Sequence, residues 1–146
     1  MDKVIIKNVR LPKTKIEKII CFVTPKGLKL PAIIIKPARG EWLIDGIYYA
    51  NDHEILLKVA KYSDFPFKMT VSKKEKKKGY MDGFSLKNKQ EALVYLLAHE
   101  IRHVWQAKHP TAKRMGRRKN KYSESDADIY AVNKLNQWRE NKKFIA

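Results

Sequence analysis

Hydrophobic residues in the first half of the chain gather in short runs rich in β-branched and aromatic side chains, separated by Pro, Gly, Asn and Asp. Such runs are typical of strands and turns. They predict strands at residues 4–9, 18–23, 31–36, 42–49, 55–60 and 67–72. A polar turn at Asn51 and Asp52 joins two of these strands into a hairpin. We therefore expect a mostly antiparallel β-sheet region in the N-terminal half.

The second half of the chain shows helical spacing instead. Asn88, followed three residues later by Glu91, predicts the capped start of a helix that ends before Pro110. The apolar stripe of this helix consists of Leu93, Leu97, Ile101 and Val104. A second helix is expected to begin after Ser123 as its cap and to end near residue 141. The expected fold class is α+β, with a sheet region followed by a pair of helices.

Length and composition indicate one domain with a hydrophobic core, because 146 residues are 44% hydrophobic. Cys21 is the only cysteine, which excludes an internal disulfide and any cysteine-based structural zinc site. No apolar run approaches the roughly 18 residues of a membrane span or the core of a signal peptide. We therefore expect a cytoplasmic protein without a membrane partner.

The net charge of +17 is unusually high for this length, and it is concentrated in two blocks. Five lysines lie between Lys73 and Lys78, and six basic residues lie between Lys113 and Lys121. Such blocks are either solvated loops or surfaces that attract nucleic acid or another polyanion. No nucleic-acid recognition motif accompanies them, so any such contact is expected to be non-specific.

The most specific pattern in the chain is the H-E-x-x-H pentapeptide from His99 to His103. On a helix, two histidines four residues apart leave the same face one turn apart and can bind a single metal ion. Glu100 would then lie beside the ion, where it can take a proton from a metal-bound water whose pKa is lowered to roughly 7. The alternative is a pair of core histidines satisfied by hydrogen bonds, since Ala92 and Leu96 share their face.

A catalytic zinc site needs a third protein ligand, and the chain offers two candidates. His109 has the histidine spacing of metzincins, but Gln106 stands where that family has glycine. On an unbroken helix His109 would point about 120° away from His103. Glu124 is the other candidate: it shares a face of the second helix with Asp128 and apolar residues, and carboxylates on a buried face need a partner. A metal ion with its histidine ligands would be such a partner.

Together, H-E-x-x-H at residues 99–103 and E-x-x-x-D at residues 124–128 resemble the motifs of gluzincin-type zinc metallopeptidases. The resemblance implies that Glu124 binds Zn²⁺ and that Asp128 accepts a hydrogen bond from His99. The run ESDADIYA is also similar to a helix of small cytosolic zincins from prophages and mobile elements. Within one domain, residues 1–146, we therefore expect a zincin-like metallopeptidase core at 44–146 and a β-rich N-terminal extension of unknown role at 1–43.

The expected function is hydrolysis of a peptide bond in a specific intracellular protein by a zinc-dependent metallopeptidase, with Glu100 as general base. The strand at residues 67–72, as the sheet edge along the cleft, is expected to bind the substrate backbone. The alternative is a basic module that binds nucleic acid or an acidic protein and carries a vestigial or structural metal site.

Overall fold

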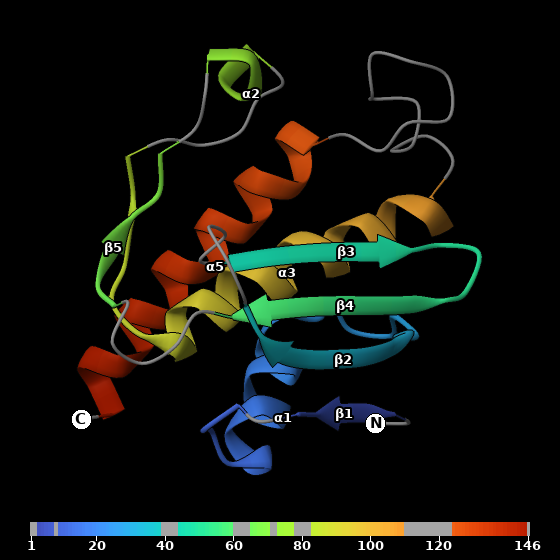
Figure 1. Cartoon of the computed structure of the whole chain (residues 1–146), viewed down its shortest axis with the longest axis horizontal. Coiled ribbons are helices and arrows are strands. Elements are labelled where there is room, and N and C mark those ends of the chain that lie inside the picture. Colours follow the sequence, from blue (N-terminus) through green and yellow to red (C-terminus); the bar gives the residue numbers. More distant parts are fainter. Residues whose placement is uncertain are drawn as a thin grey trace.

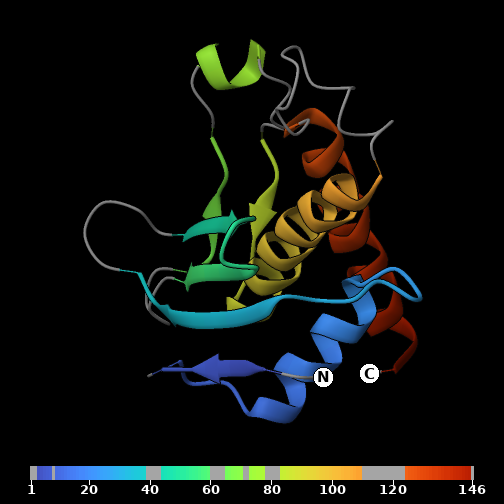
Figure 2. The same ribbon diagram turned by 90° about the vertical axis from the view of Figure 1, so that its right-hand side faces the viewer.

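The fold is α+β, with a four-stranded mixed sheet and helices on one side of it (Figures 1 and 2). The computed structural model describes residues 3–7, 9–38, 44–59, 65–70, 73–77, 83–109 and 124–145. The strands of the sheet are β1 (Val4–Ile6), β2 (Ala32–Pro37), β3 (Ile44–Tyr49) and β4 (Glu54–Val59). The longer helices are α1 (Lys13–Val23), α3 (Lys89–Lys108) and α5 (Glu124–Ile145). Across these described ranges, no helix is long and apolar enough to cross a membrane.

The strand order of the sheet is β1-β2-β4-β3. β1 pairs with β2 and β2 with β4 in parallel, and only β3 and β4 are antiparallel. The expectation of a mostly antiparallel sheet is therefore wrong, although the β3–β4 hairpin was predicted. α1 lies between β1 and β2 in the sequence and provides the crossover connection that parallel neighbours need. The prediction missed this crossover because it read part of α1 as a strand. β1 and β2 thus belong to the same sheet as the hairpin.

The apolar run at residues 18–23, predicted as a strand, is the second half of α1. The strand prediction was wrong, and the spacing of the buried side chains shows why. Ile16, Ile19, Ile20 and Val23 are completely buried and recur at the helical period rather than on alternate positions. The β-branched composition favoured a strand, but burial of one helical face decided the outcome.

The core lies between the sheet and α3. Alternate residues of β2 and β4 are buried: Ile33, Ile35, Ile55, Leu57 and Val59. The predicted stripe of α3 is confirmed, since all four of its residues are completely buried. Because α3 also packs against α1 and α5, residues all round this helix are buried and little of it remains exposed.

The start of α3 is also as predicted. The Asn88 side chain accepts a hydrogen bond from the Glu91 backbone amide at 2.9 Å, which satisfies one of the amides at the helix start. The Glu91 carboxylate is bound by Arg139 of α5 at 2.7 Å. α5 continues to Ile145, beyond the predicted end near residue 141, and its predicted cap, Ser123, lies outside the described residues.

A separate hairpin rises past the sheet and carries the first lysine block (Figures 1 and 2). Its strands β5 (Phe67–Lys68) and β6 (Ser85–Leu86) are antiparallel, and α2 (Lys73–Lys77) lies between them in sequence. The predicted strand at 67–72 is therefore much shorter and does not edge the main sheet. The lysine block forms a short helix rather than the expected loop. The second basic block, residues 113–121, lies outside the described residues.

Candidate metal centre

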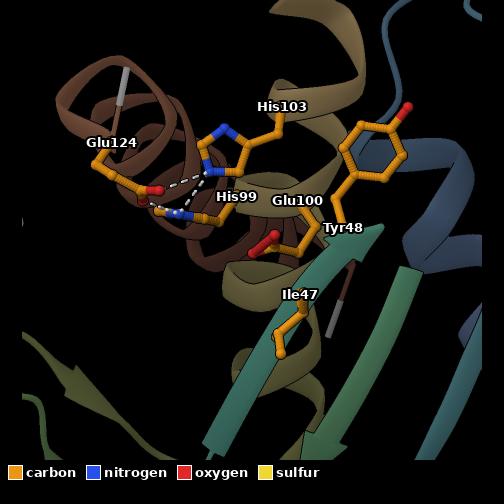
Figure 3. A pocket seen from close by; sticks show the side chains of 7 residues that line it. Ile47, Tyr48, His99, Glu100, His103 and Glu124 are labelled. Carbon is orange, nitrogen blue, oxygen red and sulfur yellow. Dashed lines mark hydrogen bonds and ion pairs between the residues drawn. The ribbon is translucent and has the colours of Figure 1, made fainter. Parts of the chain in front are cut away.

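The H-E-x-x-H pentapeptide lies in the middle of α3, on the part of the helix that faces β3 and the start of α5 (Figure 3). His99, Glu100 and His103 are buried, with 7%, 5% and 5% of their surfaces exposed. The Nε2 atoms of His99 and His103 are 3.2 Å apart. The helical spacing thus brings the two imidazoles to one point, as the sequence predicts.

Glu124 reaches the same point from the first turn of α5. Its Oε2 atom lies 2.9 Å from Nε2 of His99, and its Oε1 atom lies 3.4 Å from Nε2 of His103. Figure 3 shows this carboxylate facing both imidazoles. Two different helices, α3 and α5, therefore bring two imidazoles and a carboxylate together.

Asp128 lies one turn further along α5, and its side chain is completely buried. Nδ1 of His99 lies 3.2 Å from its Oδ1 atom, and the Tyr95 hydroxyl donates to the same oxygen. Because an ionised carboxylate only accepts hydrogen bonds, Nδ1 of His99 carries the proton. Such a partner sets the tautomer and the orientation of a metal-binding histidine.

The electrostatics of the cluster favour a positive charge at its centre. Burial on its own would lower the pKa of His99, but hydrogen bonds to Asp128 and Glu124 outweigh burial and raise the pKa to about 10. Burial would likewise raise the pKa of Glu124, but its hydrogen bonds with His103 and His99 hold that pKa well below its usual range. Without a metal ion, a proton would therefore occupy the space between these groups.

Glu100 faces a cleft of about 280 Å³ that separates the ligand cluster from the edge strand β3. The cleft is lined by Gly46, Ile47, Tyr48, His99, Glu100, His103 and Glu124. Burial raises the pKa of Glu100, although the neighbouring histidines oppose the shift. A raised pKa suits a carboxylate that must accept a proton and later return it.

Gly46 leaves the space that the Glu100 side chain occupies. A Cβ atom at position 46 would lie 3.3 Å from Cγ and from Oε2 of Glu100, and 3.1 Å from the Leu57 side chain. These contacts are tighter than ordinary packing. The missing side chain of Gly46 therefore lets α3 carry its carboxylate close to β3.

His109, the alternative third ligand, does not join the cluster. It caps the end of α3, its Nδ1 atom donates to the Trp105 carbonyl at 2.7 Å, and its ring stacks on the Trp105 ring. It is exposed and does not line the cleft. The helix continues unbroken through Gln106, so His109 is carried round to another face, as the spacing predicts.

The chemistry and spacing of the donor atoms suit a zinc ion. Two imidazole nitrogens and a carboxylate oxygen are common zinc ligands, and tetrahedral ligands with bonds of about 2.0–2.1 Å stand about 3.3 Å apart. The separations of 3.2, 2.9 and 3.4 Å are close to that value. One ring nitrogen of each histidine and one carboxylate oxygen of Glu100 also lie within 4.8 Å of one another. Glu124 contacts both histidines directly, whereas Glu100 faces the cleft.

Sequence reasoning missed two parts of this site. One is the wall formed by β3, although a glycine inside a strand pattern is itself an indication that another group approaches closely. The other is Gln106, whose amide lies 3.0 Å from Nδ1 of His103. Neither could be assigned a role before the elements were brought together in space.

Comparison of the chain with protein-family models, with curated proteins and with solved structures found no match. The function must therefore be inferred from the chemistry of the cluster and the cleft.

Proposed function

We propose that this protein is a zinc-dependent metallopeptidase in which His99, His103 and Glu124 hold the ion. The observation that carries the proposal is the contact of Glu124 with the Nε2 atoms of both histidines, beside a cleft that holds a further carboxylate. Core histidines satisfied by hydrogen bonds could use the Glu124 carboxylate as a partner, but they would not need the open cleft next to it.

A bound zinc ion would act as a Lewis acid that polarises a carbonyl and lowers the pKa of water to about 7. Glu100 is the proton carrier of this chain: its carboxylate takes a proton from the attacking water and delivers it to the nitrogen of the leaving amine. Asp128 holds the His99 ring in place through Nδ1, so that Nε2 faces Glu124.

β3 is the element best placed to bind an extended peptide. It ends the strand order of the four-stranded sheet in the described part of the chain, and its residues line the cleft beside Glu100. A substrate strand could pair with this edge by main-chain hydrogen bonds. This assignment replaces the strand at 67–72, which the structure places in a different sheet.

The test measures zinc content and peptide hydrolysis in the wild-type protein and in Glu100→Gln. An unstructured polypeptide is the substrate, and mass spectrometry identifies the products. Glu100→Gln should bind zinc as the wild type does and lose roughly 10²- to 10⁴-fold in hydrolysis rate, because it removes only the proton carrier. Glu140→Gln, an exposed change on α5, is the matched control and should change neither quantity. Full activity in Glu100→Gln would contradict the proposal.

The short helix α2 favours a second function, attraction of a polyanion such as nucleic acid. Lys73, Lys74, Lys76 and Lys77 are all exposed on it. Phosphate contacts of this kind weaken steeply as salt concentration rises. DNA binding that is lost when these lysines become glutamine, and that persists after chelation of zinc, would support this function, whereas binding unaffected by the substitutions would contradict it.

A further inference from the structure

Gln106 lies on α3 less than one turn beyond His103 and is completely buried. Its Oε1 atom is 3.0 Å from Nδ1 of His103, and its Nε2 atom donates to Oδ2 of Asp126 at 2.9 Å. Asp126 belongs to the first turn of α5, between Glu124 and Asp128. A buried amide thus joins a candidate metal ligand on one helix to the turn that carries another ligand.

The charge of Asp126 determines which way this amide points. A carboxylate can only accept, so the amide nitrogen of Gln106 must face Asp126 and its oxygen must face His103. An amide oxygen in turn accepts only, which requires Nδ1 of His103 to carry a proton. With that proton held by Gln106, Nε2 is the ring nitrogen of His103 left to bind an ion, and it faces His99 and Glu124.

Arg102 holds Asp126 from the other side. Its Nε atom donates to Oδ2 of Asp126 at 2.7 Å and its Nη2 atom to Oδ1 at 3.2 Å. The guanidinium group also lies over the Trp105 ring, 3.8 Å from the ring centroid. A paired fork of this kind fixes a carboxylate in direction as well as in position.

We propose that Gln106, held by Asp126 and Arg102, is the positioning residue of His103 and locks the two halves of the metal site together. The inference rests on the proposed function, because it concerns the ligands of the same ion. The two histidines are held differently. His99 is bonded directly to a carboxylate, whereas His103 is bonded to the amide of Gln106, which is itself bonded to the Asp126 carboxylate. The first two turns of α5 thereby supply Glu124 as a ligand and the anchors for both imidazoles.

The first test removes the relay. Gln106→Leu should weaken the binding of zinc alone by roughly 10- to 100-fold, which is the usual cost of losing a group that orients a ligand. It should also alter the visible absorption spectrum of bound Co²⁺, which reports ligand geometry. Gln137→Leu, an exposed change on α5, is the matched control and should leave both measurements unchanged.

The second test exchanges the two groups and keeps the buried hydrogen bonds. Gln106→Glu alone places two carboxylates against each other and should weaken zinc binding. Gln106→Glu combined with Asp126→Asn restores a donor opposite the new carboxylate and should recover most of the affinity. Thermal unfolding of the metal-free variants measures general damage to the fold separately. A merely structural role would change the unfolding temperatures without this loss and recovery of zinc affinity.

The outcomes distinguish the inference from the function on which it rests. Zinc binding by the wild type with affinity unchanged in Gln106→Leu overturns the positioning role alone. Failure of the double variant to recover affinity, with folding intact, also overturns it. No zinc binding by the wild type overturns both. Should Gln106→Leu fail to fold, ¹⁵N NMR of the wild-type histidines decides: a proton on Nδ1 of His103 supports the relay, and a proton on Nε2 contradicts it.

Discussion

The two walls of the candidate cleft are built on opposite principles. The wall formed by α3 and α5 is dense in buried polar groups, and its two histidines are oriented by hydrogen bonds, His99 by Asp128 and His103 by Gln106. The wall formed by β3 offers a glycine, a partly exposed isoleucine and the edge of a sheet. A wall that holds a charge must be closely packed, with its polar groups hydrogen-bonded, whereas a wall that receives a substrate must leave space.

The largest effect expected is on the helical wall, from loss of a ligand. Glu124→Ala should weaken zinc binding by at least about 100-fold, because a binding free energy on the order of 10 kcal/mol is shared among few ligands. His109→Ala is the matched control for the rejected ligand and should leave affinity unchanged. Competition with a chromophoric chelator measures both constants. A large loss in His109→Ala together with normal binding in Glu124→Ala would reverse the assignment.

A smaller effect is expected on the sheet wall, and of a different kind. Gly46→Val puts a branched side chain where a Cβ atom alone already comes within 3.3 Å of Glu100, so the carboxylate must move. Hydrolysis should fall by roughly 10- to 100-fold, as for other small misplacements of a catalytic group.

Zinc affinity should change little in Gly46→Val, because the altered contacts involve Glu100 and Leu57 and none of the three ligands. The two walls would then be separable, one for binding the ion and one for placing the proton carrier and the substrate. Equal losses of zinc binding and hydrolysis would show that the walls are not independent.

The smallest expected effect is the release of a proton from the helical wall when zinc binds. Since hydrogen bonds to Asp128 and Glu124 raise the pKa of His99 to about 10, this imidazole is protonated at pH 8 in the metal-free protein. Zinc requires the unprotonated ring, so binding should release about one proton, and affinity should increase as pH rises toward that pKa.

Titration calorimetry in two buffers of different ionisation enthalpy measures this proton release. Asp128→Asn replaces a charged acceptor of His99 by a neutral one, so the pKa of His99 should be lower and zinc binding should release fewer protons. Zinc binding without proton release at pH 8 would contradict the charged state assigned to His99.

The comparison of the walls also explains which parts were predictable. Local features depend on neighbours along the chain, and these were predicted: the Asn88 cap, the stripe of α3, and the common face of His99 and His103. The strand expected at residues 18–23 was wrong because composition and burial pointed to different elements. The parallel pairing of β2 and β4 was missed because these strands are not neighbours in the sequence, and their pairing depends on how the complete sheet assembles.

By itself, the sequence determined that two histidines share one face of a helix and that a glutamate lies beside them, because an α-helix has 3.6 residues per turn. It also marked Glu124 and Asp128 as carboxylates that needed a partner. Only the tertiary structure decided that Glu124 meets both imidazoles, that Gln106 reaches Asp126, and that Gly46 makes room for Glu100. These contacts join elements distant in sequence, and their distances depend on how α3 docks on both α5 and the sheet.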